Sequence, residues 1–248
     1  MTTQQPSAAS SRRPPIRQGE RPMRRPQPQA SHSHGPSPKG RAKRSAENHG
    51  QPGGRTAKLT RKTGETGIFV QIDLDGAGQV RADTGIGFFD HMLAALGRHG
   101  GLDLSIVVSG DLHVDDHHTI EDVGIALGEA FYEAIGDKAG IERFGSALVP
   151  LDEALCETVI DVSGRPFIAW NVRFEREYVG RMSTEMVEEF FRAFVMSARV
   201  TAHINLKAGH NGHHIAEAVF KSFARALRMA VAPDPRQDGV VPSTKGVL

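Results

Sequence analysis

The chain has 248 residues and a formal net charge of +1, and 39% of its residues are hydrophobic, which suffices for one large domain or two small ones. Its single cysteine, Cys156, excludes an internal disulfide and makes a reducing cytoplasm the expected compartment. No apolar run has the length or flanks of a membrane span or a secretory signal, so no membrane partner is expected.

Residues 1–55 have an unusual composition. They hold eleven of the 30 Lys and Arg residues and nine of the 14 prolines, against two acidic residues, Glu20 and Glu47. So few apolar residues cannot offset the entropy of ordering the chain, and we predict a disordered basic tail. Its function stays open between nucleic-acid binding through residues 41–44 and organelle targeting, although its prolines oppose the amphipathic helix of a transit peptide. The rest of the chain, residues 56–248, is acidic, and we expect no nucleic-acid binding by this folded part.

Apolar spacing and turn residues predict the elements of the first half of the folded part. Alternating Ile68, Val70 and Ile72 are typical of a strand, and Asp75-Gly76 is typical of a hairpin turn. In chain order, we expect extended segments over 59–73, a return strand over 79–84, a helix over 88–96, a strand over 102–108 and a helix from His117 to about Ile135.

The second half is predicted to repeat this order. We expect strands over 148–162 and 166–174 joined by a turn at 163–165, a helix capped by Ser183 or Thr184, a strand over 200–206 and a last helix to Pro233. Equivalent residues of the two final helices lie 96 positions apart, which indicates a duplicated half-domain with pseudo-repeats at about 56–140 and 141–235. A pseudo-twofold axis would let these two helices face each other, within a subunit or across an interface.

Both final helices begin with the pattern His-His-x-x-Glu, at residues 117–121 and 213–217. Helical residues three and four apart share one face, so each pattern is expected to aim two imidazoles and a carboxylate at one point, as metal ligands do. Chance or an ordinary helix start explains a single copy better than metal binding does. Two copies with identical spacing favour metal binding.

A further ligand is expected from the helix that precedes each pattern. When the halves are aligned, His91 falls opposite Glu189, and both side chains can ligate a borderline or hard divalent ion. Each half then offers two histidines, one glutamate and one further donor, which is enough for two metal ions with positions left for substrate. For Glu189, a solvated position on the helix surface is an equal alternative.

Six ordered motifs over residues 58–248 resemble those of the imidazoleglycerol-phosphate dehydratases. They are GFFDHML (87–93), DHHTIED (116–122), GSALVPLDE (145–153), SGRP (163–166), HNGHHIAE (210–217) and PSTKG (242–246). The resemblance implies an α+β fold, an α/β sandwich, in which a duplicated half-domain packs sheets against helices with left-handed βαβ crossovers, against the usual handedness. It also implies two Mn²⁺ ions per active site and a homo-oligomer of trimers with octahedral symmetry and active sites between subunits.

The resemblance also assigns roles to individual positions. The implied metal ligands are His91, His117, His118, Glu121, His213, His214 and Glu217, and Glu189 stands where the family frequently has a histidine. Glu65 is expected to bind the substrate and transfer a proton, with Glu121 and Glu217 as further catalytic residues. The remaining substrate-binding residues are expected to be His91, Arg143, Arg165, Ser243 and Lys245, of which the last four suit a phosphate group.

The implied reaction removes water from imidazole glycerol phosphate to give imidazole acetol phosphate, a step of histidine biosynthesis. Ring deprotonation at the metals would let the imidazole expel the neighbouring hydroxyl, and a base such as Glu65 would then remove a proton from the next carbon. Two alternatives come from other classes: a metal-dependent hydrolase that activates water, and a metal-storing assembly without chemistry. The six motifs favour the dehydratase over both.

Overall fold

The structure, a computed structural model, describes residues 45–46, 54–246 and 248, which belong to the compact unit Arg41–Leu248. Most of the predicted disordered tail lies outside these residues. Within it, Ser45–Ala46 form a short strand, β1, that pairs antiparallel with residues 59 and 60. Over the described ranges, no helix has both the length and the apolar character that a membrane span needs.

The first half of the unit forms a sheet with the strand order β1-β2-β3-β5-β4. Its main strands are β2 (Thr56–Lys62), β3 (Thr66–Asp73), β4 (Val80–Asp83) and β5 (Asp103–Gly110). The predicted hairpin at Asp75-Gly76 is wrong, because β3 pairs with β2 on one edge and with all eight residues of β5 on the other. No edge of β3 remains for β4, which instead pairs parallel with β5.

The second half forms a sheet with the order β6-β7-β11-β8, the same order as the main strands of the first sheet. Its strands are β6 (Phe144–Leu151), β7 (Ala154–Asp161), β8 (Phe167–Asn171) and β11 (Thr201–Ala208), and β8 and β11 are parallel. The single strand predicted over 148–162 is wrong. A hairpin turn interrupts it at Asp152, whose φ of 48° reverses the chain between β6 and β7.

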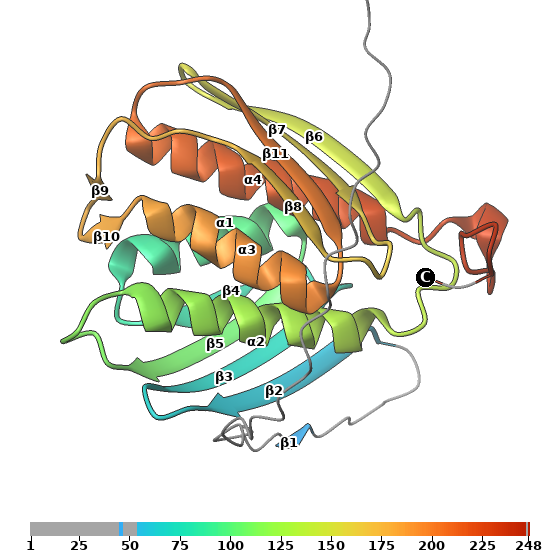
Figure 1. Cartoon of the computed structure of the whole chain (residues 1–248). Coiled ribbons are helices and arrows are strands. Elements are labelled where there is room, and N and C mark those ends of the chain that lie inside the picture. The colour runs from blue at the N-terminus through green and yellow to red at the C-terminus, as the bar shows by residue number, and fades with distance from the viewer. Residues whose placement is uncertain (1–44, 47–53, 247) are drawn as a thin grey trace, which may run out of the picture. The chain divides into compact units, whose positions relative to one another are not determined.

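Four helices fill the space between the two sheets, as Figure 1 shows: α1 (Gly87–Gly100), α2 (His117–Ile135), α3 (Glu185–Ala198) and α4 (Gly212–Val231). α2 packs on β2 and β3 and against α3, whereas α4 packs on β6 and β7 and against α1. The expectation that α2 and α4 face each other is therefore not met within this chain. Each final helix instead pairs with the earlier helix of the other half.

The interface between the helices is built from aromatic side chains. Phe89 of α1, Phe190 and Phe194 of α3, and Phe220 and Phe223 of α4 are almost completely buried. Phe190 lies 5.3 Å from both Phe89 and Phe220, measured between ring centroids, so the two halves share one core. Burial of each such ring stabilises the fold by about 1.5–3 kcal/mol relative to an exposed ring, before the entropy of ordering is counted.

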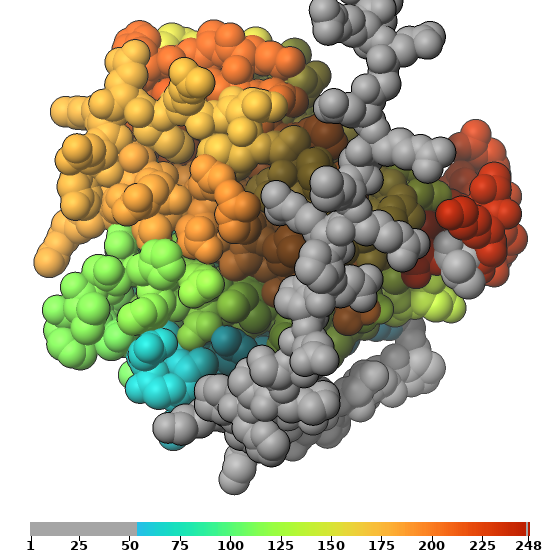
Figure 2. All heavy atoms as spheres, viewed as in Figure 1, coloured from blue at the N-terminus to red at the C-terminus, as the bar shows by residue number. Residues whose placement is uncertain are grey.

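All four helices begin at the same end of the sandwich, on the left in Figure 1. At that end the backbone N–H of Ser183, in the short hairpin of β9 (Tyr178–Val179) and β10 (Met182–Ser183), donates to the carboxylate of Asp116. Figure 2 shows these segments, green and orange, together on the surface. Thr184 occupies the predicted cap position of α3, but its hydroxyl donates to the carbonyls of Arg176 and Glu177 instead of capping the helix.

Candidate metal centres and substrate site

The first cluster of candidate ligands joins α1 to α4, and we call it the α1/α4 centre. It consists of His91, His213 and Glu217, whose ligand atoms all lie within 4.8 Å of one another. One carboxylate oxygen of Glu217 lies 3.3 Å from Nε2 of His91 and 3.1 Å from Nε2 of His213. The amide oxygen of Asn211 accepts bonds from the first N–H groups of α4 and so fixes where this helix begins.

Lys221 stands beside this centre. Its Nζ lies 2.6 Å from the second carboxylate oxygen of Glu217. Burial tends to raise the pKa of Glu217, but the bond and charge of Lys221, with the bonds from His91 and His213, outweigh it and lower this pKa to about 2. Glu217 is therefore ionised and ready to ligate a cation over the whole physiological pH range.

The second cluster joins α2 to α3 in the same way, and we call it the α2/α3 centre. His117, Glu121 and Glu189 bring their ligand atoms within 4.8 Å of one another. Close packing of the helices produces this approach, because a side chain at Gly124 of α2 would collide at 2.8 Å with the backbone oxygen of Phe190 of α3. The predicted correspondence of Glu189 with His91 thus has a structural counterpart, since each is the one residue of its cluster that lies outside the His-His-x-x-Glu helix. Each joins the pattern of the other half of the chain, not the pattern of its own half.

The second histidine of each pair turns away from these clusters. Nδ1 of His118 lies 3.0 Å from a carboxylate oxygen of Asp111, and Nδ1 of His214 lies 2.6 Å from one of Glu153. The expectation that both imidazoles of a pair aim at one point is therefore wrong within a single chain, because adjacent helical residues point about 100° apart. In both cases Nε2 has no hydrogen bond among the described residues.

Hydrogen bonds to these two carboxylates raise the pKa values of both imidazoles. The bond with Asp111 is the main cause for His118, and the bond with Glu153 is the main cause for His214. Reciprocally, the bond from His214, with the backbone N–H of Asn211, lowers the pKa of Glu153 to about 2. A carboxylate on Nδ1 is the arrangement that orients a histidine whose Nε2 ligates a metal.

Asp111 and Glu153 are the two candidate functional residues that sequence reasoning missed. Glu153 was part of a recognised motif, but its spacing from the histidines gave no indication of a role. The internal repeat could have indicated Glu153, because it directly precedes β7 just as Glu65 directly precedes β3 in the first half. Asp111 follows β5 directly and has no such counterpart, since Gly209 follows β11.

Glu65, the predicted proton-transfer residue, lies in the turn between β2 and β3. Its carboxylate is exposed and its Oε1 is 4.0 Å from Nε2 of His118. Buried Asp122 of α2 holds this turn, because it accepts hydrogen bonds from the hydroxyl of Thr66 and from two nitrogens of Arg61, at 2.9 and 3.0 Å. The turn that carries Glu65 is thereby tied to the helix that carries the first His-His pair.

The four residues predicted to bind phosphate gather elsewhere. Arg143 forms a two-point ion pair with Asp161, at 2.8 and 3.2 Å, and donates to the carbonyl of Pro242, next to Ser243. The guanidinium of Arg165 is exposed and lies 3.7 Å from the same Asp161. The structure therefore brings Arg143, Arg165 and the segment with Ser243 and Lys245 together, with Arg143 already bound to protein groups.

We call the region of Arg143, Arg165, Ser243 and Lys245 the phosphate-set region. It is far from the candidate metal ligands of the same chain. The backbone N–H of Arg143 donates to the carbonyl of Ala230, in the last turn of α4, whereas His214 lies in the first turn. These two positions are 16 residues apart along one helix, which corresponds to about 24 Å at the helical rise per residue. One small substrate cannot span that distance within one chain.

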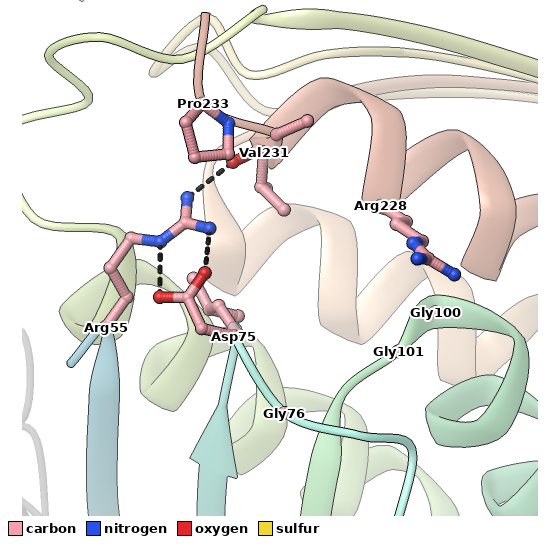
Figure 3. A pocket seen from close by; sticks show the side chains of 10 residues that line it. Arg55, Asp75, Gly76, Gly100, Gly101, Arg228, Val231 and Pro233 are labelled. Carbon is pink, nitrogen blue, oxygen red and sulfur yellow. Dashed lines mark hydrogen bonds and ion pairs between the residues drawn. The ribbon is translucent and has the colours of Figure 1, made fainter. Parts of the chain in front are cut away.

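A separate pocket of about 290 Å³ opens at this C-terminal end of α1 and α4 (Figure 3). Its lining includes Arg55, whose guanidinium binds Asp75 and the carbonyl of Val231, and Arg228, which lies beside the Gly100-Gly101 turn. None of the predicted metal or substrate residues lines it. It belongs to the opposite end of the helices from both ligand clusters.

Comparison with known proteins identifies the family. A family model described as imidazoleglycerol-phosphate dehydratase matches residues 84–227, which include both ligand clusters. The chain belongs to the imidazoleglycerol-phosphate dehydratase family. It is 66% identical over 194 residues to the dehydratase of Gluconacetobacter diazotrophicus and 63% identical to that of Gluconobacter oxydans, in each case over 78% of this chain and 98% of the relative.

Solved structures of dehydratases confirm the predicted α+β sandwich. That of Staphylococcus aureus has a TM-score of 0.66 and 41% identity and covers 72% of this chain and 99% of its own. That of Pyrococcus furiosus has a TM-score of 0.66 and 36% identity and covers 76% of this chain and 99% of its own. The match to the dehydratase family model includes Arg143 and Arg165, whereas Glu65, Ser243 and Lys245 lie outside it.

Proposed function

We propose that this chain catalyses the Mn²⁺-dependent removal of water from imidazole glycerol phosphate to give imidazole acetol phosphate. Its membership of the dehydratase family supports the reaction class. The observation that carries the metal-dependent part is the pair of ligand clusters, each built from two helices at the same end of the sandwich. The single cysteine, Cys156, is buried and forms no disulfide, which agrees with the proposed location of the enzyme in the reducing cytoplasm.

The donor atoms suit manganese. Each cluster offers imidazole nitrogens and carboxylate oxygens and no thiolate, a combination that borderline and hard divalent ions accept. Three donors per cluster leave room for further ligands. His118 and His214, each oriented through Nδ1 by a carboxylate, are the natural additional donors through Nε2.

We further propose that the active sites lie between subunits of a homo-oligomer, with the trimer-based octahedral assembly of the family. The supporting argument is the separation within one chain: the phosphate-set region is at the C-terminal end of α4, and the ligand clusters are at the N-terminal end. A complete site then needs the phosphate set of one copy and the ligand clusters of another. His118 and His214, which turn away from the clusters of their own chain, fit the same arrangement.

Different residues of the chain have different roles in the proposed reaction. Arg165 and Lys245, with Ser243 and Arg143, hold the substrate phosphate and fix the position of the carbon chain. The two clusters would hold the metal ions, whose charge would lower the pKa of the substrate's imidazole N–H groups. Glu121 and Glu217 would contribute carboxylate ligands to these ions. Glu65, on the turn that Asp122 holds, removes the proton from the carbon chain.

Turnover of imidazole glycerol phosphate by the purified full chain tests the proposal. Activity should disappear after treatment with a chelator and return with Mn²⁺, and the product should be a ketone that retains its phosphate. Release of inorganic phosphate would instead establish a metal-dependent hydrolase. A loaded oligomer that does not turn over this substrate would overturn the proposed reaction.

Two matched variants test the role of Glu65. Glu65→Gln should lower kcat by about 10²–10⁴-fold, the usual contribution of a positioned acid or base, while metal content stays unchanged. Glu175→Gln changes a similar exposed carboxylate, on the loop after β8, and should retain full activity. Near-normal turnover of Glu65→Gln would assign proton transfer to another group.

A further inference from the structure

The two halves of the chain supply different residues at one equivalent ligand position. His91 is the fifth of 14 residues in α1, and Glu189 is the fifth of 14 residues in α3. Each of these helices connects a strand to its parallel neighbour in the sheet, β4 to β5 and β8 to β11. The α1/α4 centre therefore has two imidazoles and one carboxylate, whereas the α2/α3 centre has one imidazole and two carboxylates.

The charges around the two centres also differ. Lys221, four residues after Glu217, binds its carboxylate at 2.6 Å and offsets the one negative charge of the α1/α4 centre. The matching position after Glu121 is Ile125, which carries no charge. The cation nearest to Glu189 is Arg192, at 4.0 Å, and its guanidinium is already bound to Glu188. The α2/α3 centre therefore keeps a larger net negative charge.

The different donor atoms of the two centres predict different preferences for divalent metal ions. Imidazole suits zinc and the later transition metals, whereas carboxylate oxygens suit manganese and magnesium, and intrinsic affinities otherwise favour Zn²⁺ over Mn²⁺. A second carboxylate in place of an imidazole removes part of that zinc advantage and increases the electrostatic attraction for any divalent ion. His118 and His214 are the same kind of donor, so they add nothing that would cancel the contrast.

We propose that the two metal centres of this chain are unlike, with Glu189 making the α2/α3 centre selective for hard divalent ions. The α1/α4 centre, with two imidazoles, accepts Zn²⁺ in preference to Mn²⁺. The α2/α3 centre keeps Mn²⁺ or Mg²⁺ when Zn²⁺ competes. This inference rests on the proposed metal-dependent function and assigns a specificity-determining role to a single side chain.

Metal competition on the full-length oligomer tests the proposal without measuring activity. Chelator-stripped protein is first loaded with Mn²⁺ alone, and then with equal concentrations of Mn²⁺ and Zn²⁺, and the metal content per chain is measured by elemental mass spectrometry. Wild type should hold two Mn²⁺ in the first case, and one Zn²⁺ with one Mn²⁺ in the second.

Three variants test whether the residues at positions 189 and 91 set the metal preference of the two centres. Glu189→His should raise the Zn²⁺ preference of the α2/α3 centre by at least about tenfold, so that competition yields two Zn²⁺ per chain. The reciprocal His91→Glu should yield chains with two Mn²⁺, and it keeps the proposal testable if the first variant does not assemble. Glu142→His, which adds an imidazole at an exposed carboxylate beside the C-terminal end of α4 and outside both centres, should retain the mixed occupancy of the wild type.

Each outcome has a distinct meaning. Two Zn²⁺ in wild type, or the same result for Glu142→His as for Glu189→His, would overturn the inference and leave the proposed metal dependence intact. Failure of wild type to take up any divalent ion would overturn the metal-dependent function itself, and this inference with it. Mixed occupancy in wild type, with opposite shifts in the two reciprocal variants, would support both.

Discussion

Glu153, in the turn between β6 and β7, accepts a hydrogen bond from Nδ1 of His214, at a distance of 2.6 Å. A sheet hairpin and a helix start, 61 residues apart in the sequence, are thereby joined at the end of the sandwich where all four helices begin. Asp111 does the same for His118 at 3.0 Å. In each case a carboxylate from the end of a strand orients an imidazole from the first turn of a helix.

The bond between Glu153 and His214 predicts a pH-dependent contribution to the stability of the metal-free protein. The pKa of Glu153 is lowered from 4.5 to about 2, so its contribution is complete above 4.5 and disappears as the pH falls toward 2. The pKa of His214 is raised from 6.5, so its contribution is complete below 6.5 and disappears as the pH rises through the raised value. The pair therefore stabilises most between these limits.

Thermal unfolding of chelated Glu153→Gln measures this contribution. The Tm of the variant should fall further below that of wild type near about pH 5.5 than near about pH 9, because the contribution of His214 decreases as the pH rises through its raised pKa. Asp152→Asn removes a neighbouring exposed carboxylate that is 3.8 Å from Nε2 of His214, and it should change Tm little at either pH. An equal loss of Tm for Glu153→Gln at both pH values would contradict the assigned titration.

The distance between the phosphate-set region and the ligand clusters predicts complementation between inactive subunits. Arg165→Ala and His214→Ala oligomers should each be inactive. Co-expressed chains should regain part of the activity, because some sites combine an intact phosphate set from one copy with intact ligands from another. Steady-state turnover of the purified mixture checks this result.

A second mixture provides the control. Leu248 lies against the Gly164 turn next to Arg165, and Pro242 accepts a bond from Arg143, so residues 242–246 and 248 belong to the same phosphate-set region. Arg165→Ala combined with Lys245→Ala should therefore remain inactive, because every set then lacks one member. Rescue of this pair, or no rescue of the first pair, would argue against sites shared in this way.

Buried Asp122 predicts a positioning effect on Glu65. Asp122→Asn weakens the bonds to Arg61 and Thr66 and should lower the free energy of unfolding by about 2 kcal/mol, as expected for bonds to a charged group. It should also lower kcat more than it raises KM, because the turn that carries Glu65 loses its support. Asp83→Asn, at an exposed residue of β4, should change neither quantity. A loss of stability with normal kcat would restrict Asp122 to a structural role.

The close contact of α2 with α3 predicts a selective effect of Gly124→Ala. The added Cβ meets the backbone oxygen of Phe190 at 2.8 Å and should cost about 1–3 kcal/mol of unfolding free energy by overpacking. Because it separates Glu189 from His117, it should release metal from the α2/α3 centre first. Unfolding by denaturant and metal content per chain measure both effects. Gly67→Ala, where a Cβ meets no atom within 4 Å, is the matched control.

Local sequence patterns predicted the helices and most strands because these depend on nearby residues. The spacing of apolar residues placed α1 and α3 near their observed bounds, and each His-His-x-x-Glu pattern contains the two residues that its helix contributes to a ligand cluster. The two incorrect elements both concern strand pairing. A turn such as Asp75-Gly76 permits a hairpin, but whether β4 pairs with β3 depends on which strand already occupies the edge, and that strand is β5.

The sequence alone determined which residues are the candidate ligands, because ligand type and helical spacing are local properties. The internal repeat also matched His91 with Glu189 before any contact between helices was known. The tertiary structure decided how these residues are grouped: α2 meets α3, α4 meets α1, and His118 and His214 turn to Asp111 and Glu153. Packing of buried phenylalanines and glycines between helices distant in sequence sets those neighbours, and no local pattern encodes it.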